Sequence, residues 1–409
     1  MRSYDVIVVG AGAAGMMAAI SAAKMGARTA ILEHMDQAGK KLLSTGNGKC
    51  NFTNRAQGVE FYRGQDPAFV LPALRQFGLE ETLAFFQGIG IFPKEKRGGY
   101  FYPASEQAAS VRQALLLELA RLNVDIHCGI GIRSVWKEEN LFFFETKQGT
   151  FQSRVCVIAT GGKAAKKTGS DGSGIPYIEG FGHHVLPFVP ALVQLQGKQS
   201  FLKELAGIRA EAVISLFVDG TKTAEDQGEL QLTDFGVSGI PAFQISRYAV
   251  VALRQQKKVS VSIDFAPDRT HKELNRYILH QKEQYPGKYV RDILIGLLNS
   301  KLIPVLLRES GISSDSRLDQ CSRIQLAQLL DNIKCFSIDI IGSKSFDTAQ
   351  VCAGGVNTTE IDGRTMQSKL VRGLYFAGEV VDIDGMCGGY NLQWAWSSGW
   401  VAGHYGGMI

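Results

Sequence analysis

The chain has 409 residues, of which 45% are hydrophobic and 20% charged, and its formal net charge is +5. This length allows two or three domains with cores of their own, and the small positive excess gives no reason to expect a nucleic-acid or membrane partner. The first residues enter an apolar strand directly, so no signal peptide is expected. Seven cysteines without a C-x-x-C pair favour reduced thiols in the cytoplasm, and the histidines show no metal-ligand spacing, so no metal site is predicted.

A βαβ unit opens the chain. Residues 4–9 form an apolar run typical of a buried parallel strand, residues 13–25 are rich in helix formers, and residues 28–32 form a second apolar run. Three glycines with G-x-G-x-x-G spacing separate the first strand from the helix. The motif predicts that Gly10 makes a tight turn, Gly12 lets the backbone approach a pyrophosphate, and Gly15 lets the helix pack on the sheet.

The turn and the second strand together predict a dinucleotide site. The helix N-terminus offers unpaired N–H groups and the positive end of its dipole to phosphates. Glu33 ends the second strand, where an acid accepts hydrogen bonds from ribose hydroxyls. The predicted contacts in this unit are Gly10, Ala11, Gly12, Ala13, Ala14, Gly15, Glu33 and His34.

The following elements suggest that this domain is split by an insertion. A polar, glycine-rich loop covers residues 36–54, and Ser105 is expected to cap a helix over residues 106–121. Strands are predicted over residues 124–131 and 132–136, a hairpin over 141–146 and 149–153, and a further strand over 154–159. Residues 190–267 read as β-rich, with strands at 211–218 and 259–265. Residues 270–330 read as helical from a capping box at Thr270 and Glu273. Strand character returns at 335–341 and 374–377, before a last helix over 392–402.

Five further segments have the composition of a cofactor site. Residues 39–51 combine glycines, hydroxyls and amides with Lys41, which suits a backbone cradle with a lysine near phosphate. Ile132 offers strand backbone to an adenine edge, while residues 157–162 and 169–174 are glycine-rich strand ends and turns. Residues 373–393 contain a strand, a glycine-rich turn and a second helix N-terminus at Asn391, which suits the developing negative charge of a reduced flavin.

At these segments the chain resembles the two-dinucleotide-binding-domain flavoproteins. The resemblance is closer to the aminoacetone oxidase family of FAD-binding proteins, which includes the BaiN/YhiN-type flavoproteins. It is carried by G-K-K-L-L-S-T-G-N-G-K-C-N-F-T-N (39–54), T-D-F-G-V-S-G-I-P-A (233–242), V-C-A-G-G-V-N (351–357), T-M-Q-S-K-L-V-R-G-L-Y-F-A-G-E (365–379) and D-I-D-G-M-C-G-G-Y-N-L-Q (382–393).

The resemblance implies an α/β fold and non-covalently bound FAD. The expected FAD-binding, Rossmann-like domain comprises residues 1–189 and 341–409. The insertion comprises a β-barrel-like substrate domain at 190–268 and a helical domain at 269–340. Outside the opening unit, the implied or predicted FAD contacts are Lys41, Ser44, Gly46, Gly48, Asn51, Ile132, Thr160, Gly161, Gly162, Gly378, Glu379, Gly388, Gly389, Asn391 and Leu392.

The expected activity is that of an FAD-dependent oxidoreductase acting on a small molecule. The first interpretation is an oxidase or dehydrogenase of a small amine. One alternative is a reductase of a conjugated C=C bond, of the bile-acid type, with NAD(P)H as a transient electron donor. The other is a flavin-bound module for binding or redox sensing. Catalytic residues and oligomeric state are not predicted. Cys50 and Cys387 could form a redox pair, although buried, inert cysteine is favoured. Trp394, Trp396 and Trp400 on the last helix could form the wall of a substrate pocket, although core or interface packing is favoured for at least two of them.

Overall fold

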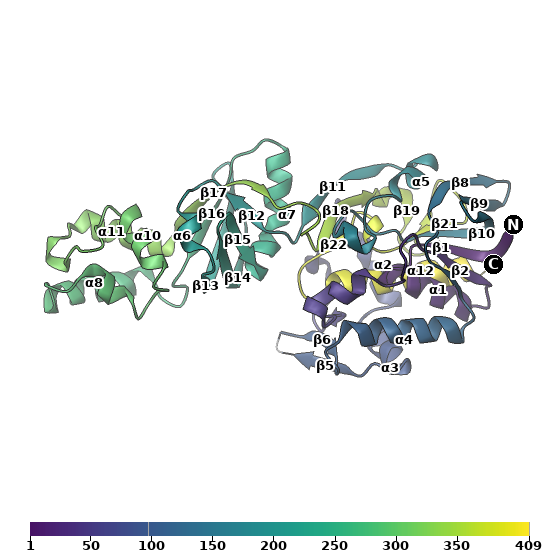
Figure 1. Cartoon of the computed structure of the whole chain (residues 1–409), viewed down its shortest axis with the longest axis horizontal. Helices are drawn as coiled ribbons and strands as arrows, with labels where there is room; N and C mark the ends of the chain where they lie inside the picture. Colours follow the sequence, from purple (N-terminus) through teal and green to yellow (C-terminus); the bar gives the residue numbers. More distant parts are fainter. Residues whose placement is uncertain (97, 409) are drawn as a thin grey trace. The chain divides into compact units, whose positions relative to one another are not determined.

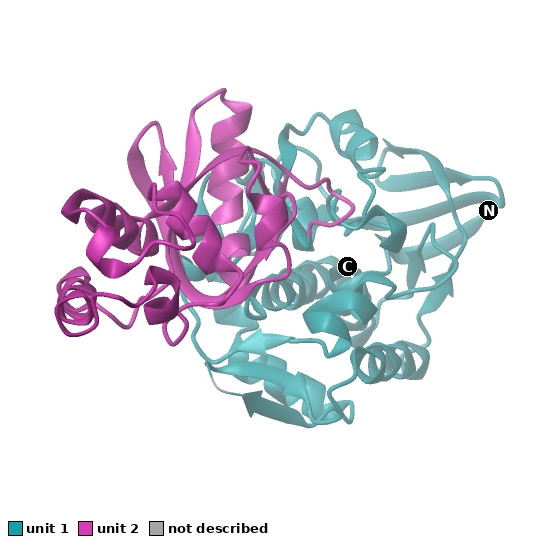
Figure 2. Ribbon diagram, turned by 60° about the vertical axis from the view of Figure 1, so that its left-hand side comes forward, with its two compact units in different colours: residues 1–189, 350–409 teal, residues 190–349 magenta. Residues whose placement is uncertain are grey.

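The computed structural model describes residues 1–96 and 98–408. The chain divides into two compact units, coloured separately in Figure 2. Unit 1 comprises Met1–Val189 and Gln350–Ile409, and unit 2 comprises Pro190–Ala349. None of the helices within the described ranges has both the length and the apolar character that a membrane crossing requires.

A mostly parallel sheet forms the centre of unit 1. Its strands follow the order β19-β20-β21-β10-β1-β2-β7, and the five from β21 to β7 run parallel to one another. Residues 6–9 and all of β2 are buried, as expected for a parallel sheet covered on both faces. The carboxyl ends of these strands meet at one edge, where open α/β sheets bind ligands. The bounds are β1 (Arg2–Val9), β2 (Thr29–Leu32), β7 (Asp125–His127), β10 (Gly149–Ile158), β19 (Ile361–Asp362), β20 (Gln367–Ser368) and β21 (Leu374–Phe376).

Strand β10 combines two elements that the sequence predicts separately. One strand spans residues 149–158, whereas a hairpin strand over 149–153 and another strand over 154–159 are expected. Its first half pairs antiparallel with β9 (Leu141–Thr146), which pairs with β8 (Ile132–Glu138), while β1 runs parallel along most of its length. Burial alternates in the first half and is continuous over residues 155–158. This change of pattern inside one strand explains the false break.

Helices α1 (Ala13–Lys24) and α12 (Tyr390–Gly407) pack closely through small residues. A Cβ on Gly399 would lie 2.4 Å from the carbonyl oxygen of Ala14, and a Cβ on Gly403 would lie 2.0 Å from that of Ala18. Only glycine permits such an approach of two backbones. The two ends of the chain therefore share one core, and α12 extends past both ends of the predicted helix.

Helix α4 (Ala108–Arg121) is present, but its predicted cap is wrong. The residue at the N-cap position is Gln107, and the Ser105 hydroxyl donates to the Ser110 hydroxyl instead of accepting from the helix backbone. The remaining helices and strands of unit 1, the last residues of β11 excepted, are α2 (Leu71–Gln76), α3 (Leu79–Gly88), α5 (Ile175–Gly180), β3 (Thr53–Asn54), β4 (Tyr62–Arg63), β5 (Pro93–Lys96), β6 (Tyr100–Pro103), β11 (Val185–Ala191), β18 (Val351–Val356) and β22 (Asp384–Gly385).

Unit 2 contains a closed barrel of strands in the order β12-β15-β14-β13-β16-β17. Figure 1 shows α8, α10 and α11 gathered beyond one end of this barrel, and one hydrophobic core includes residues of both parts. The strands are β12 (Leu195–Gly197), β13 (Arg209–Val218), β14 (Thr221–Thr233), β15 (Gly236–Gly239), β16 (Val259–Asp264) and β17 (Phe336–Ser343). The helices are α6 (Leu202–Leu205), α7 (Ile240–Arg254), α8 (His271–Gln284), α9 (Val290–Leu294), α10 (Leu302–Glu309) and α11 (Arg323–Lys334).

The predicted fold class, a Rossmann-type domain with an inserted barrel and helices, is confirmed. Three details differ. Strand β14 is mostly polar and only two of its residues are buried, so its sequence carries little strand signal. Helix α7 lies within the region expected to be β-rich. Strand β17 continues to Ser343 inside the barrel, which moves the return to unit 1 from residue 341 to residue 350. The capping box of α8 forms as predicted.

Candidate active site

Two glycines of the opening motif, Gly10 and Gly12, line a cleft at the carboxyl edge of the sheet, and the third, Gly15, packs behind them. Gly10 has φ of +101°, and a Cβ there would lie 2.6 Å from the carbonyl oxygen of Ala159. A Cβ on Gly15 would lie 1.9 Å from the carbonyl oxygen of Gly10, so the helix touches the turn. A Cβ on Gly12, which lines the cleft, would meet no atom within 4 Å. The space beside Gly12 is therefore open to a ligand.

Glu33 follows β2 and is held rigidly at the wall of the cleft. It is 7% exposed, and its two carboxylate oxygens accept hydrogen bonds from the backbone N–H groups of Ala11 (2.7 Å) and Met35 (2.8 Å). Burial raises the pKa of this carboxyl, but hydrogen bonds from His34 and the two N–H groups outweigh burial and lower the pKa overall. The same contact raises the pKa of His34. Glu33 is thus an ionised acceptor with lone pairs left for a ribose.

Two buried hydroxyls in the cleft wall have no protein partner. Among the described residues, neither Thr160 Oγ1 nor Ser170 Oγ makes a hydrogen bond, and both residues line the cleft. Leaving a buried hydroxyl unsatisfied costs about 1–3 kcal/mol. Phosphate, ribose or ribitol oxygens would satisfy them. These hydroxyls, the open space at Gly12 and the acid at Glu33 all fit a dinucleotide such as FAD.

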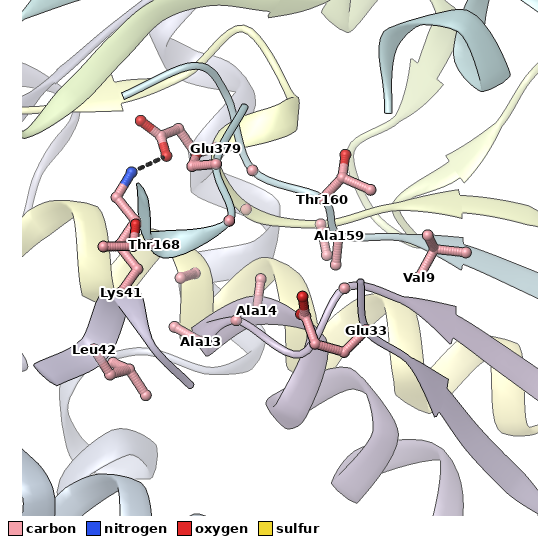
Figure 3. A pocket seen from close by; sticks show the side chains of 18 of the residues that line it. Val9, Ala13, Ala14, Glu33, Lys41, Leu42, Ala159, Thr160, Thr168 and Glu379 are labelled. Atoms are coloured by element: carbon pink, nitrogen blue, oxygen red, sulfur yellow. Dashed lines mark hydrogen bonds and ion pairs between the residues drawn. The ribbon is translucent and has the colours of Figure 1, made fainter. Parts of the chain in front are cut away.

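An ion pair joins distant segments beside the cleft. Lys41 begins η1 (Lys41–Gly48), and Glu379 lies in η7 (Gly378–Val380). Figure 3 marks the ion pair between these side chains with a dashed line, and their Nζ and Oε2 atoms are 2.8 Å apart. Glu379 Oε1 accepts a hydrogen bond from the backbone N–H of Cys352 at 2.7 Å. A cation and an anion thus both face the space where a charged cofactor would lie.

The first turn of α12 forms another part of the wall. Asn391 and Leu392 line the cleft, and the Asn391 side chain exchanges two hydrogen bonds with the backbone of Gly385, at 2.8 and 2.7 Å. The helix therefore presents its N-terminus from a fixed turn. The positive end of its dipole favours negative charge nearby.

The structure brings fourteen of the predicted site residues together in this cleft, which holds about 1200 Å³ of atom-free space with its open mouth included. The fourteen are Gly10, Gly12, Ala13, Ala14, Glu33, His34, Lys41, Ile132, Thr160, Gly161, Gly378, Glu379, Asn391 and Leu392.

The other nine predicted residues do not line the cleft, because some of them pack closely against neighbouring segments and others are exposed. A Cβ on Gly389 would lie 2.6 Å from the Thr53 carbonyl oxygen, and one on Gly162 would lie 3.2 Å from the Cys352 side chain. In η1, Ser44, Gly46 and Gly48 are exposed, while Thr45 lines the cleft in their place. The nine are Ala11, Gly15, Ser44, Gly46, Gly48, Asn51, Gly162, Gly388 and Gly389.

Sequence reasoning missed mostly apolar wall residues. Leu42, Ile130 and Ile383 line the cleft but read as ordinary core positions. Trp394 also lines the cleft, although its side chain is only 2% exposed. Its ring Nε1 donates a hydrogen bond to the carbonyl oxygen of Gly378 at 3.1 Å, so this residue belongs both to the core and to the cleft wall. Burial raises the pKa of Cys50 to about 12, in agreement with the favoured inert thiol.

Comparison with known proteins defines the family. The model of the HI0933-like protein Rossmann domain matches residues 4–405. The chain belongs to the HI0933-like family. The resemblance to the BaiN/YhiN-type flavoproteins is thereby confirmed, and the chain is an FAD-dependent oxidoreductase.

Relatives of the HI0933-like chain cover almost its whole length. It is 41% identical over 398 residues to a 3-dehydro-bile acid delta(4,6)-reductase of Clostridium scindens, which spans 97% of both chains. It is 33% identical over 403 residues to a ribosomal RNA dihydrouridine synthase of Escherichia coli strain K12, covering 98% of this chain and 97% of that one. The open form of a flavocytochrome c3 fumarate reductase shares the fold, with a TM-score of 0.52 and 14% identity, over 100% of this chain and 78% of the other.

Proposed function

We propose that this enzyme uses FAD to reduce a C=C bond conjugated to a carbonyl group. The observation that carries the proposal is the 41% identity to a bile-acid delta(4,6)-reductase over 97% of both chains. The dihydrouridine synthase relative points to the same chemistry, because the C5=C6 bond of uridine is conjugated to a ring carbonyl. Hydride would add to the β carbon of the substrate and a proton to the α carbon, so the product gains two hydrogen atoms.

Bound FAD would supply the hydride, and the chain's residues would position it and exclude water. Glu33 would hold the adenosine ribose, and the backbone beside Gly12 would receive the pyrophosphate. The hydroxyls of Thr160 and Ser170, which have no hydrogen-bond partner among the described residues, would donate hydrogen bonds to oxygen atoms of the cofactor. The N-terminus of α12 would stabilise negative charge on the reduced ring, and reduced nicotinamide would be the external donor.

The other two expectations receive less support. The relatives named above are a reductase and a synthase, which favour C=C reduction over the small-amine oxidation expected first. Their names also favour an enzyme over a flavin-bound module without turnover. One relative is named as an enzyme that acts on ribosomal RNA, so nucleic acid is a second candidate substrate class. The absence of a nucleic-acid partner therefore stays a prediction.

An anaerobic assay separates these functions. The holoenzyme is reduced with NADH, or with dithionite if NADH is inactive, and then mixed with a 3-oxo-4,6-diene steroid acid. We expect the oxidised flavin absorbance to return and the product mass to increase by two hydrogens. Bleaching of oxidised enzyme by small amines, together with no reoxidation by enones, would contradict the proposal and support amine oxidation. No bleaching by amines and no reoxidation by enones would support a flavin-bound module for binding or redox sensing.

A further inference from the structure

Three lysines share one carboxylate beside η1. The Oε1 and Oε2 atoms of Glu106 contact Lys94 Nζ at 3.0 Å, Lys96 Nζ at 2.8 Å and Lys49 Nζ at 3.3 Å. Their side chains are one-third to one-half exposed. The ion pairs of the described residues give these lysines no second carboxylate, so the cluster carries an excess charge of about +2.

The cluster adjoins the cleft through two short contacts. Thr45 lines the cleft and accepts, through its carbonyl oxygen, from the N–H of Cys50, which follows Lys49. On the other side, Tyr102 Cε1 would lie 3.4 Å from a Cβ on Gly46, and Lys96 Nζ lies 4.7 Å from the centre of the Tyr102 ring. Lys49 and Lys96 therefore both lie beside η1, of which Lys41, Leu42 and Thr45 line the cleft.

The lysines do not belong to the cofactor cleft itself. Among the described residues that line it, Lys41 is the one lysine, and it pairs with Glu379. The cluster instead faces solvent beside the wall, and Phe92, which directly precedes β5, is 70% exposed next to it in the chain. An exposed apolar ring two residues from Lys94 in the chain suits a molecule with an apolar body and an anionic end.

Glu106, which carries the shared carboxylate, has an uncommon backbone conformation. Glu106 has φ of +52°, a region that residues other than glycine seldom adopt. Its three lysine partners lower the pKa of its carboxyl to about 2, so the acid stays ionised at any physiological pH. Glu106 thus holds three mutually repelling ammonium groups within 3.3 Å of its carboxylate oxygens, and their excess positive charge favours a further anion.

We propose that Lys49, Lys94 and Lys96 bind an anionic group of the substrate while its conjugated C=C bond reaches the flavin. This proposal rests on the proposed function only for the identity of the bond that reacts. A steroid carboxylate and an RNA phosphate have the same recognisable chemistry, a negatively charged oxygen group, and the experiment distinguishes the two sources. Neutral enones would enter without this anchor.

The test compares two triple variants of the holoenzyme. Lys49→Gln/Lys94→Gln/Lys96→Gln removes the cluster, and Arg75→Gln/Lys147→Gln/Arg154→Gln removes equal charge from exposed positions outside the cleft lining. Exposed ion pairs contribute little to stability, so both variants are expected to fold. Substrates are 3-oxo-4,6-choladienoic acid and its methyl ester, and a uridine-containing RNA hairpin is the second probe.

For the acid, we expect the cluster variant to raise KM about tenfold with kcat unchanged, while the methyl ester and the control variant show no change. If RNA is the source of the anion, anisotropy will show binding to the wild type that falls at least tenfold in the cluster variant. Equal effects on acid and ester, or no effect on either probe, would overturn the proposal. If no enone is turned over, the proposed function fails separately, and equilibrium binding of the acid and the RNA to the oxidised enzyme still tests the lysines.

Discussion

Replacing Gly403 with alanine should destabilise unit 1, because α1 and α12 approach too closely there for a side chain. The new Cβ would lie 2.0 Å from the carbonyl oxygen of Ala18, which belongs to backbone and cannot rotate away. Overpacking of this kind costs about 1–3 kcal/mol, and the close contact places the cost at the upper end. Alanine returns about 1 kcal/mol through its higher helix propensity. The net loss is about 2 kcal/mol.

Thermal unfolding followed by circular dichroism measures this loss. For a unit of this size, about 2 kcal/mol corresponds to a fall of about 4–8 °C in Tm. Gly88 ends α3 and is the matched control, because a Cβ there would meet nothing within 4 Å. Gly88→Ala should leave Tm unchanged or raise it. Equal Tm values for the two variants would show that α1 and α12 are not in backbone contact, and the reasoning would fail.

Three further variants test the cleft and its surroundings. Glu33→Ala should weaken FAD binding about ten- to a hundredfold by titration, and should also lower the Tm of the apoprotein, since two backbone N–H groups lose their acceptor. Thr160→Val should weaken FAD binding about tenfold without destabilising the apoprotein, because its hydroxyl has no partner among the described residues; a less stable apoprotein would refute this. Burial raises the pKa of Glu360, but hydrogen bonds from His184 and His183 lower it overall. Its stabilisation is therefore present above the unfolded pKa of about 4.3 and lost as pH falls through the lower folded value, so urea titrations should show Glu360→Gln losing most near neutrality and least below pH 4.

Local patterns in the sequence were enough to predict the cofactor edge of the sheet. The strand, glycine turn, helix and acid of the opening unit follow one another within thirty residues, and each has its own physical requirement. Gly10, Gly12 and Gly15 have the separate geometries expected of them. The segment that contains Glu379 and Asn391 was recognised from its strand, glycine-rich turn and helix start, and the family resemblance then implied which cofactor group each part would meet.

Contacts between distant segments could not be predicted in the same way. Nothing in the neighbourhood of Gly403 shows that it meets Ala18, because that contact depends on how two helices cross. Likewise, the loop glycines Gly46 and Gly48 have a cofactor-like composition yet are exposed, while the less conspicuous Thr45 lines the cleft. The polar strand β14 is recognisable as a strand only once β13 and β15 pair with it.

The split of unit 1 has a consequence for folding during synthesis. Strand β21 and helix α12, which complete the sheet and the cleft wall, are translated after all of unit 2. Until they leave the ribosome, α1 lacks its partner, and the apolar faces of β10 and α1 stay uncovered. Unit 2, which is contiguous in sequence and has its own core, is able to fold first. We expect FAD capture to be a late, nearly post-translational event, and nascent chains stalled before residue 374 to be exposed to chaperones and proteases.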